Sequence, residues 1–204
     1  MAILTALAHT VPLAFASGVN LYATVAVLGL CSHYGLVGLP EQFRAFDNPI
    51  IIVAAIALYL VEFVADKIPW FDSVWDVVHT VVRPVGGALV AVTALGDASP
   101  AGRVLAALLG GSIAMTTHLT KAGTRAVANT SPEPFSNWAL SLGEDVLAVG
   151  ISYVALEHPM IALAVAIALL IVIGTFASYL IRAIRRRFFG QPATASLQLP
   201  QRPR

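Results

Sequence analysis

Apolar runs of membrane-spanning length dominate this sequence of 204 residues. A spanning helix needs about 20 mostly apolar residues, and six segments come close to that length or exceed it. They lie at 4–37, 49–66, 73–96, 102–126, 136–157 and 160–184. Only 11% of the residues are charged, against about 25% in soluble domains. The sequence therefore predicts an all-α, polytopic membrane protein with about six transmembrane helices.

Segments rich in proline and glycine, such as GLPEQFRAFDNP and GDASPAG, separate these runs. Within the first run, ASGVN at 16–20 is a place where a helix would bend or break. No basic residue precedes the first apolar run, so we expect a retained helix and no cleaved signal peptide. We expect a single transmembrane domain at 1–187. Residues 188–204, rich in Pro, Gln and Ser, are expected to form a disordered cytoplasmic tail.

Two pairs of segments resemble each other. NPIIIVAAIALYLV, from Asn48, resembles HPMIALAVAIALLIV, from His158. DKIPWFDSVW, from Asp66, and NTSPEPFSNW, from Asn129, place Pro, Ser and Trp at matching positions. Three helical-hairpin repeats, at 1–67, 70–128 and 135–187, would explain both likenesses. The shared composition of apolar helices explains them equally well.

Basic residues predict the orientation. An even number of spans puts both termini and the second and fourth loops on one side. Of the 12 Lys and Arg residues, 10 fall on that side: Lys67, Arg83, Lys121, Arg125, Arg182, Arg185, Arg186, Arg187, Arg202 and Arg204. Because cytoplasmic loops carry the excess of Lys and Arg, we expect both termini in the cytoplasm.

Ionisable residues recur at helical spacing on several segments. Asp72, Asp76, His79 and Arg83 fall at i, i+4, i+7 and i+11, which is one face of a helix. Such groups are costly inside a bilayer, roughly 2.5–3.5 kcal/mol each on insertion scales, so stripes of opposite charge are expected to face each other. The candidates to line a polar cavity open to the cytoplasm are Asn20, Glu62, Asp66, Asp72, Asp76, His79, Arg83, His118, Lys121, Arg125, Asn129, Glu133, Asn137, Glu144 and Asp145.

These stripes allow several functions. The leading hypothesis is a small transporter or channel-like protein for a polar or anionic solute. Alternatively, the ion pairs only fix helix packing in a structural protein. A solvated loop would also explain the charges from Lys67 to Asp72. A metal site at Asp72, Asp76 and His79 is a weaker hypothesis, because cationic residues lie nearby. An intramembrane lipid-processing enzyme would need a nucleophile, for which Ser73, Ser131 and Ser136 are only generic candidates.

The partners expected from composition are the lipid bilayer and an unidentified small solute. The net charge of +1 gives no indication of nucleic-acid binding, and no motif calls for a cofactor. A homo-oligomer is compatible with the sequence. The single cysteine, Cys31, excludes an intrachain disulfide and is expected to be a packing residue.

Three long segments carry a resemblance to a known family. They are GVNLYATVAVLGL, LVEFVADKIPWFDSVWDVVHTVVRP and KAGTRAVANTSPEPFSNWALSLGEDVL. With them, the chain from about Ala14 to Pro159 resembles the bacterial membrane family known as domain of unknown function 4126. The resemblance implies a multi-pass protein of the bacterial inner membrane, and it implies no activity.

Overall fold

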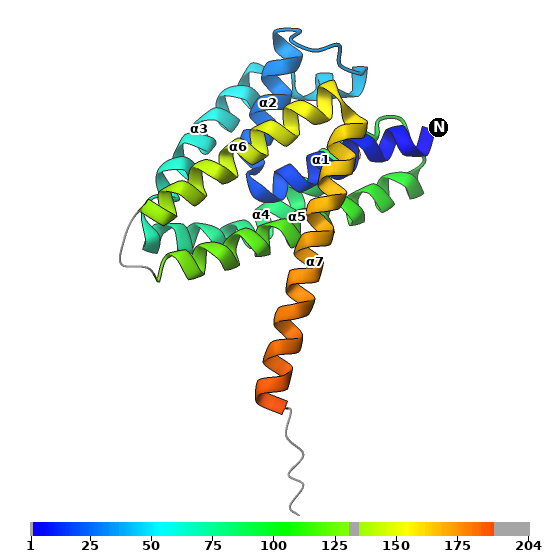
Figure 1. The fold of residues 1–204 in the computed structure, drawn as a ribbon. Coiled ribbons are helices and arrows are strands. Elements are labelled where there is room, and N and C mark those ends of the chain that lie inside the picture. The colour runs from blue at the N-terminus through cyan, green and yellow to red at the C-terminus, as the bar shows by residue number, and fades with distance from the viewer. Residues whose placement is uncertain (1, 131–134, 190–204) are drawn as a thin grey trace, which may run out of the picture. The chain divides into compact units, whose positions relative to one another are not determined.

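The computed structural model describes residues 2–130 and 135–189 (Figure 1). Those residues form helices and connecting turns without any strand, which confirms the all-α prediction. The helices are α1 (Ala2–Val19), α2 (Leu21–His33), the 3₁₀ helix η1 (Glu41–Phe46), α3 (Pro49–Ala65), α4 (Pro69–Leu95), α5 (Pro100–Ala128), α6 (Phe135–Glu157) and α7 (Pro159–Phe189). The chain divides into two units, 1–170 and 171–204, and the division falls inside α7.

Prolines begin four of these helices: α3, α4, α5 and α7. Proline suits the first helical position because its fixed φ is already helical and its missing N–H needs no partner there. For this reason α4 begins at Pro69, four residues before the expected start of the third span. The first two residues of the tail predicted at 188–204 belong to α7, and its remainder lies outside the described residues.

The central element of the first unit is α1. Every residue from Ala8 to Leu21 is buried. The helix lies between the α4–α5 pair and α6 (Figure 1). A helix that is apolar on all sides is expected to occupy such a position. Several small polar side chains of this stretch, including Ser17 and Asn20, are therefore held inside the bundle.

The first apolar run is interrupted at Asn20, as ASGVN predicted. Asn20 has extended backbone angles, φ −151° and ψ 101°, between α1 and α2. Its side-chain oxygen accepts a hydrogen bond from the backbone N–H of Ala23 at 2.9 Å, so that it caps the start of α2. The expected single segment at 4–37 is thus two consecutive helices.

Three helices are long and apolar enough to cross a membrane: Trp70–Leu95, Phe135–Glu157 and Pro159–Ala183. Three further apolar helices, Leu4–Val19, Leu21–His33 and Pro49–Ala65, are shorter. Helix α5 has 29 residues, about 43 Å at 1.5 Å per residue, but it carries four ionisable side chains. These findings indicate a membrane protein with three candidate spans in its described residues, and the count of six stays a prediction.

Small residues bring α4 and α5 into close contact. A Cβ atom added at Gly110 would lie 2.2 Å from the Cβ of Ala91 and 2.8 Å from the carbonyl oxygen of Gly87. One added at Gly87 would lie 2.4 Å from the Cβ of Ala114. Membrane helices associate through such small-residue contacts, because packing replaces the hydrophobic effect between them. The α4–α5 spacing therefore depends on glycine at these positions.

Replacing Gly110 with alanine should destabilise the protein, because neither the Ala91 methyl group nor the Gly87 backbone can move aside locally. The expected loss is about 1–3 kcal/mol, measured by unfolding in mixed detergent micelles. Gly123→Ala is the matched control in the same helix, since a Cβ there meets nothing within 4 Å, and it should gain about 0.5–1 kcal/mol. Equal effects of the two variants would contradict the close α4–α5 contact.

Candidate functional site

The charged stripes predicted from sequence converge in one buried network. They come from the ends of α3 and α5 and the beginnings of α4 and α6. The side chains therefore face each other, as the cost of isolated intramembrane charge predicts. At least nine-tenths buried are Glu62, Asp66, Asp72, Asp76, His79, Arg83, His118, Lys121, Arg125, Asn137 and Asp145.

Glu62 binds two cations through one of its carboxylate oxygens. It is completely buried and accepts bonds from Arg83 Nη2 at 2.5 Å and Lys121 Nζ at 3.1 Å. The other terminal nitrogen of Arg83 donates to the Gly18 carbonyl oxygen at 3.2 Å and to His118 Nδ1 at 3.0 Å. One carboxylate thus joins α3 to α4 and α5, and the guanidinium group extends the connection to α1.

Arg125 organises a second part of the network. Its guanidinium group lies 3.1 Å from Asp72 Oδ1 and 3.2 Å from Asp66 Oδ2. It also donates to the Asp66 carbonyl oxygen at 2.7 Å and to the Asn137 side-chain oxygen at 2.9 Å. Asn129 donates to the second oxygen of Asp72 at 2.8 Å. This arginine therefore fixes the turn between α3 and α4 against α6.

Lys121 connects the two parts. Its ammonium group lies 3.1 Å from Glu62, 3.2 Å from Asp66 and 3.5 Å from Glu144. Because one cation serves three carboxylates, the network is continuous from Arg83 to Arg125.

The break between α1 and α2 lies against this network. Asn20 Nδ2 donates to Asp145 Oδ1 at 3.0 Å, while the Gly18 carbonyl oxygen, one residue before the end of α1, accepts from Arg83. Asn20 therefore both caps α2 and bonds to a neighbouring helix. An interrupted helix presents backbone groups that no longer complete a helical turn, and such groups can bind ions or solutes.

Hydrogen bonds define the histidine tautomers. Arg83 can only donate, so His118 Nδ1 accepts and its proton is on Nε2, which lies 3.2 Å from Thr80 Oγ1. His79 Nδ1 donates to the Trp75 carbonyl oxygen at 2.8 Å, and Nε2 lies 3.1 Å from the Tyr22 hydroxyl group, which can donate to it. Both rings fit the neutral form in this arrangement.

The segment before the network is partly exposed. Trp70 is 71% exposed, and Lys67 is half-buried, with Nζ 2.9 Å from the Phe63 carbonyl oxygen. This partial burial lowers the pKa of Lys67. Asp72 is 1% exposed. The solvated-loop interpretation thus fits Lys67 and Trp70 and is wrong for Asp72.

Some predicted residues are not part of the network. Glu133 and the generic nucleophile Ser131 lie outside the described residues. Residues 2–130 and 135–189 contain no group of three His, Cys, Asp or Glu side chains placed to hold a metal ion. The weaker metal hypothesis at Asp72, Asp76 and His79 thus finds no geometric support. Cys31 is buried in the apolar core, as predicted.

Other contributors were not predicted. Tyr22 and Thr80 bond to the two histidines, and the only signal for Tyr22 was its place two residues after Asn20. The Gly18 contact is made by a backbone oxygen, which no side-chain pattern reveals.

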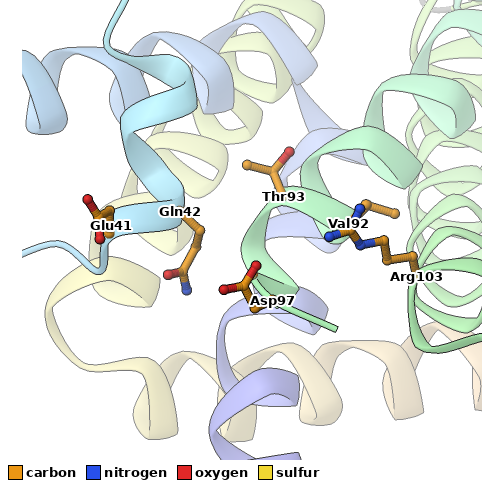
Figure 2. Close-up of a pocket in the computed structure, with 7 residues that line it drawn as sticks. Glu41, Gln42, Val92, Thr93, Asp97 and Arg103 are labelled. Carbon is orange, nitrogen blue, oxygen red and sulfur yellow. The ribbon is translucent and has the colours of Figure 1, made fainter. Parts of the chain in front are cut away.

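A separate polar pocket of about 490 Å³ was also missed. Figure 2 shows Gln42, Asp97 and Arg103 around it, contributed by η1, the turn between α4 and α5, and the start of α5. Its residue Thr93 lies 14 positions after His79 on α4, about 21 Å along the helix. The pocket and the network therefore occupy different levels of the bundle.

The helices and the buried network together define an all-α protein of membrane type. Residues 7–178 match the model of the family described as Domain of unknown function (DUF4126). The chain belongs to this family, which confirms the resemblance seen in the sequence. No curated protein and no solved structure matches the chain.

Removing the Arg125 side chain should strongly destabilise the protein, because Asp66 and Asp72 would remain buried without this partner. Breaking a buried pair on one side costs about 3–5 kcal/mol. We expect that loss for Arg125→Met in a detergent unfolding titration. Arg103→Met, on the same helix but exposed, should change stability by less than about 0.5 kcal/mol. A small effect at Arg125 would show that the network contributes little to folding.

Proposed function

We propose that the protein is a small transporter or channel-like protein for a polar or charged solute in the bacterial inner membrane. The supporting observation is the helix break at Asn20, which lies directly against the buried charged network. Many transporters bind solutes where a membrane helix is interrupted, and intramembrane ionisable groups are functional candidates by default. The break and the charges occur together here, and together they support a solute site more strongly than either feature would alone.

The network also supports a closed state for the proposed transporter. Arg83 and Arg125 are 0% exposed, and Lys121 is 4% exposed. A solute would reach these groups only after the helices separate and some ion pairs are exchanged. An anionic group on the solute could replace a carboxylate at Arg83 or Arg125, while a cationic group could replace Lys121. Movement of α1 or α2 about Asn20 would provide such an opening.

Asn20→Ala should abolish transport. It removes the cap of α2, at a stability cost of about 1 kcal/mol, and the bond to Asp145, at a further cost of about 1–3 kcal/mol. Candidate solutes would first be selected by thermal shift with inorganic phosphate, small carboxylates and divalent metal salts, since a ligand stabilises the folded state by mass action. Flux of the stabilising compound into proteoliposomes is then measured.

The control for this experiment is Asn48→Ala. Asn48 caps α3 by accepting from the Ile50 N–H at 2.9 Å, but it is exposed and remote from the network. It should lose about 1 kcal/mol of stability through its cap and keep full flux. Normal flux in Asn20→Ala would contradict the proposed route.

A structural protein is the second candidate. It is favoured by the multiple short contacts of Arg125, which resemble a packing device more than an open site. In this case no solute stabilises the protein, and wild-type vesicles show no flux above empty vesicles.

We further propose that both termini and the α3–α4 turn face the cytoplasm, from the excess of basic residues on that side. In a Cys31→Ala background, a cysteine at Ala98 should react with a membrane-impermeant maleimide on intact spheroplasts. A cysteine at Ile68 should react only after permeabilisation. Ile68 is 39% exposed, so access to the side chain does not limit the reaction. The reverse pattern would invert the proposed orientation.

A further inference from the structure

The buried network contains more acidic than cationic groups. Six carboxyl groups lie in it: Glu62, Asp66, Asp72, Asp76, Glu144 and Asp145. Three buried cations accompany them: Arg83, Lys121 and Arg125. The excess is three negative charges if every group is ionised, and the half-buried Lys67 at the edge reduces it to two. An uncompensated charge is very unfavourable in a membrane interior.

Histidines do not remove this excess. His118 accepts a hydrogen bond from Arg83, so that nitrogen carries no proton. His79 is bonded at Nδ1 to a carbonyl oxygen and at Nε2 to a tyrosine hydroxyl group, which fits a neutral ring. Compensation must therefore come from elsewhere.

Asp76 is the least compensated of the six. It is 8% exposed, and no described residue forms a hydrogen bond or ion pair with its carboxyl group. By contrast, Glu62, Asp66, Asp72 and Glu144 each lie within 4 Å of a cation, and Asp145 accepts from Asn20.

The charges around Asp76 are engaged elsewhere. On its own helix Asp72 and His79 are nearby, and Arg83 is bound to Glu62. From α3, Asp66 adds a negative charge. From α5, Lys121 is shared by three other carboxylates, and His118 is neutral. The Thr80 hydroxyl group donates to the backbone oxygen of Asp76, not to its carboxylate.

We propose that Asp76 is a proton-binding site, with its carboxyl group protonated in the folded protein at mildly acidic pH, where an ordinary aspartate has already lost its proton. The step is the addition of one proton from water to the carboxylate, which removes one buried negative charge. The small exposed part of Asp76 provides the contact with solvent that exchange requires. Resting on the proposed transport function, this proton is the coupling ion: its loss adds charge to the network and favours rearrangement of the ion pairs.

Infrared spectroscopy of the full-length protein in detergent tests the site directly. At about pH 5, above the usual range of carboxyl groups in water, the wild type should show the carbonyl stretching band of protonated carboxyl groups, and Asp76→Asn should lose a part of it. Glu157→Gln is the control, because Glu157 is an exposed carboxylate at the other end of α6 and should leave the band unchanged. Absence of the band in the wild type, or an unchanged band in Asp76→Asn, would overturn the proposal.

The pH dependence of unfolding provides a second measurement. If the folded state holds a proton that the unfolded state has released, stability falls as pH rises. Between about pH 5 and pH 6, above the usual range of unfolded carboxyl groups, the unfolding equilibrium constant should rise by up to about tenfold per pH unit for each such proton. Asp76→Asn should lower that slope by one proton, and an unchanged slope counts against the site.

These measurements do not require flux. A protonated Asp76 in a protein that transports nothing would leave the site in place and refute the transport proposal. Solute flux in a protein without the band would support the transport proposal and refute the proton-binding site.

Discussion

The bonds that Glu62 accepts from Arg83 and Lys121 hold the first unit together. A fully buried carboxylate needs cationic partners, and here they come from two different helices, α4 and α5. Arg83 then donates to the Gly18 carbonyl oxygen of α1. Apolar helices alone can slide and rotate against each other in a lipid environment with little change in energy. These directional contacts select one arrangement of α1, α3, α4 and α5.

Small residues allow the helices to pack closely enough for that arrangement to form. Glycines at 87 and 110 let α4 and α5 approach closely, and Gly18 lies so near α5 that an added Cβ would fall 1.7 Å from Thr117 Oγ1. Arg83 is one turn before Gly87, and His118 is one turn after Ala114, which lies against Gly18 and Gly87. The close approach therefore sets the distance at which Arg83 reaches both His118 and α1. Packing and electrostatics here depend on the same few helical turns.

Much of this followed from the sequence, because helical spacing fixes which residues share a face. The stripe Asp72, Asp76, His79 and Arg83, the basic stripe on α5 and the break at Asn20 were all predicted. Spacing does not reveal which acid meets which cation, or backbone partners such as Gly18. A hydropathy average counts every charged residue as unfavourable, whether or not it is paired. For this reason α5 is not a candidate span, although carboxylates on neighbouring helices pair with Lys121 and Arg125. The pocket beside η1 combines a loop with two helix ends, and no periodic pattern marks it.

The excess of acidic groups distinguishes a functional, proton-binding site from a purely structural network of ion pairs. In a network with equal numbers of carboxylates and cations, separating the helices does not lower the free energy, because every ion-pair partner that is lost must be replaced. When carboxylates outnumber cations, the pairing depends on which of them carry protons. Release of a proton from Asp76 would create a competitor for Lys121 and Arg83, the cations that hold Glu62 in place. Because Arg83 also binds α1 just before the break at Asn20, a change in this competition acts on the point where the central helix is least continuous.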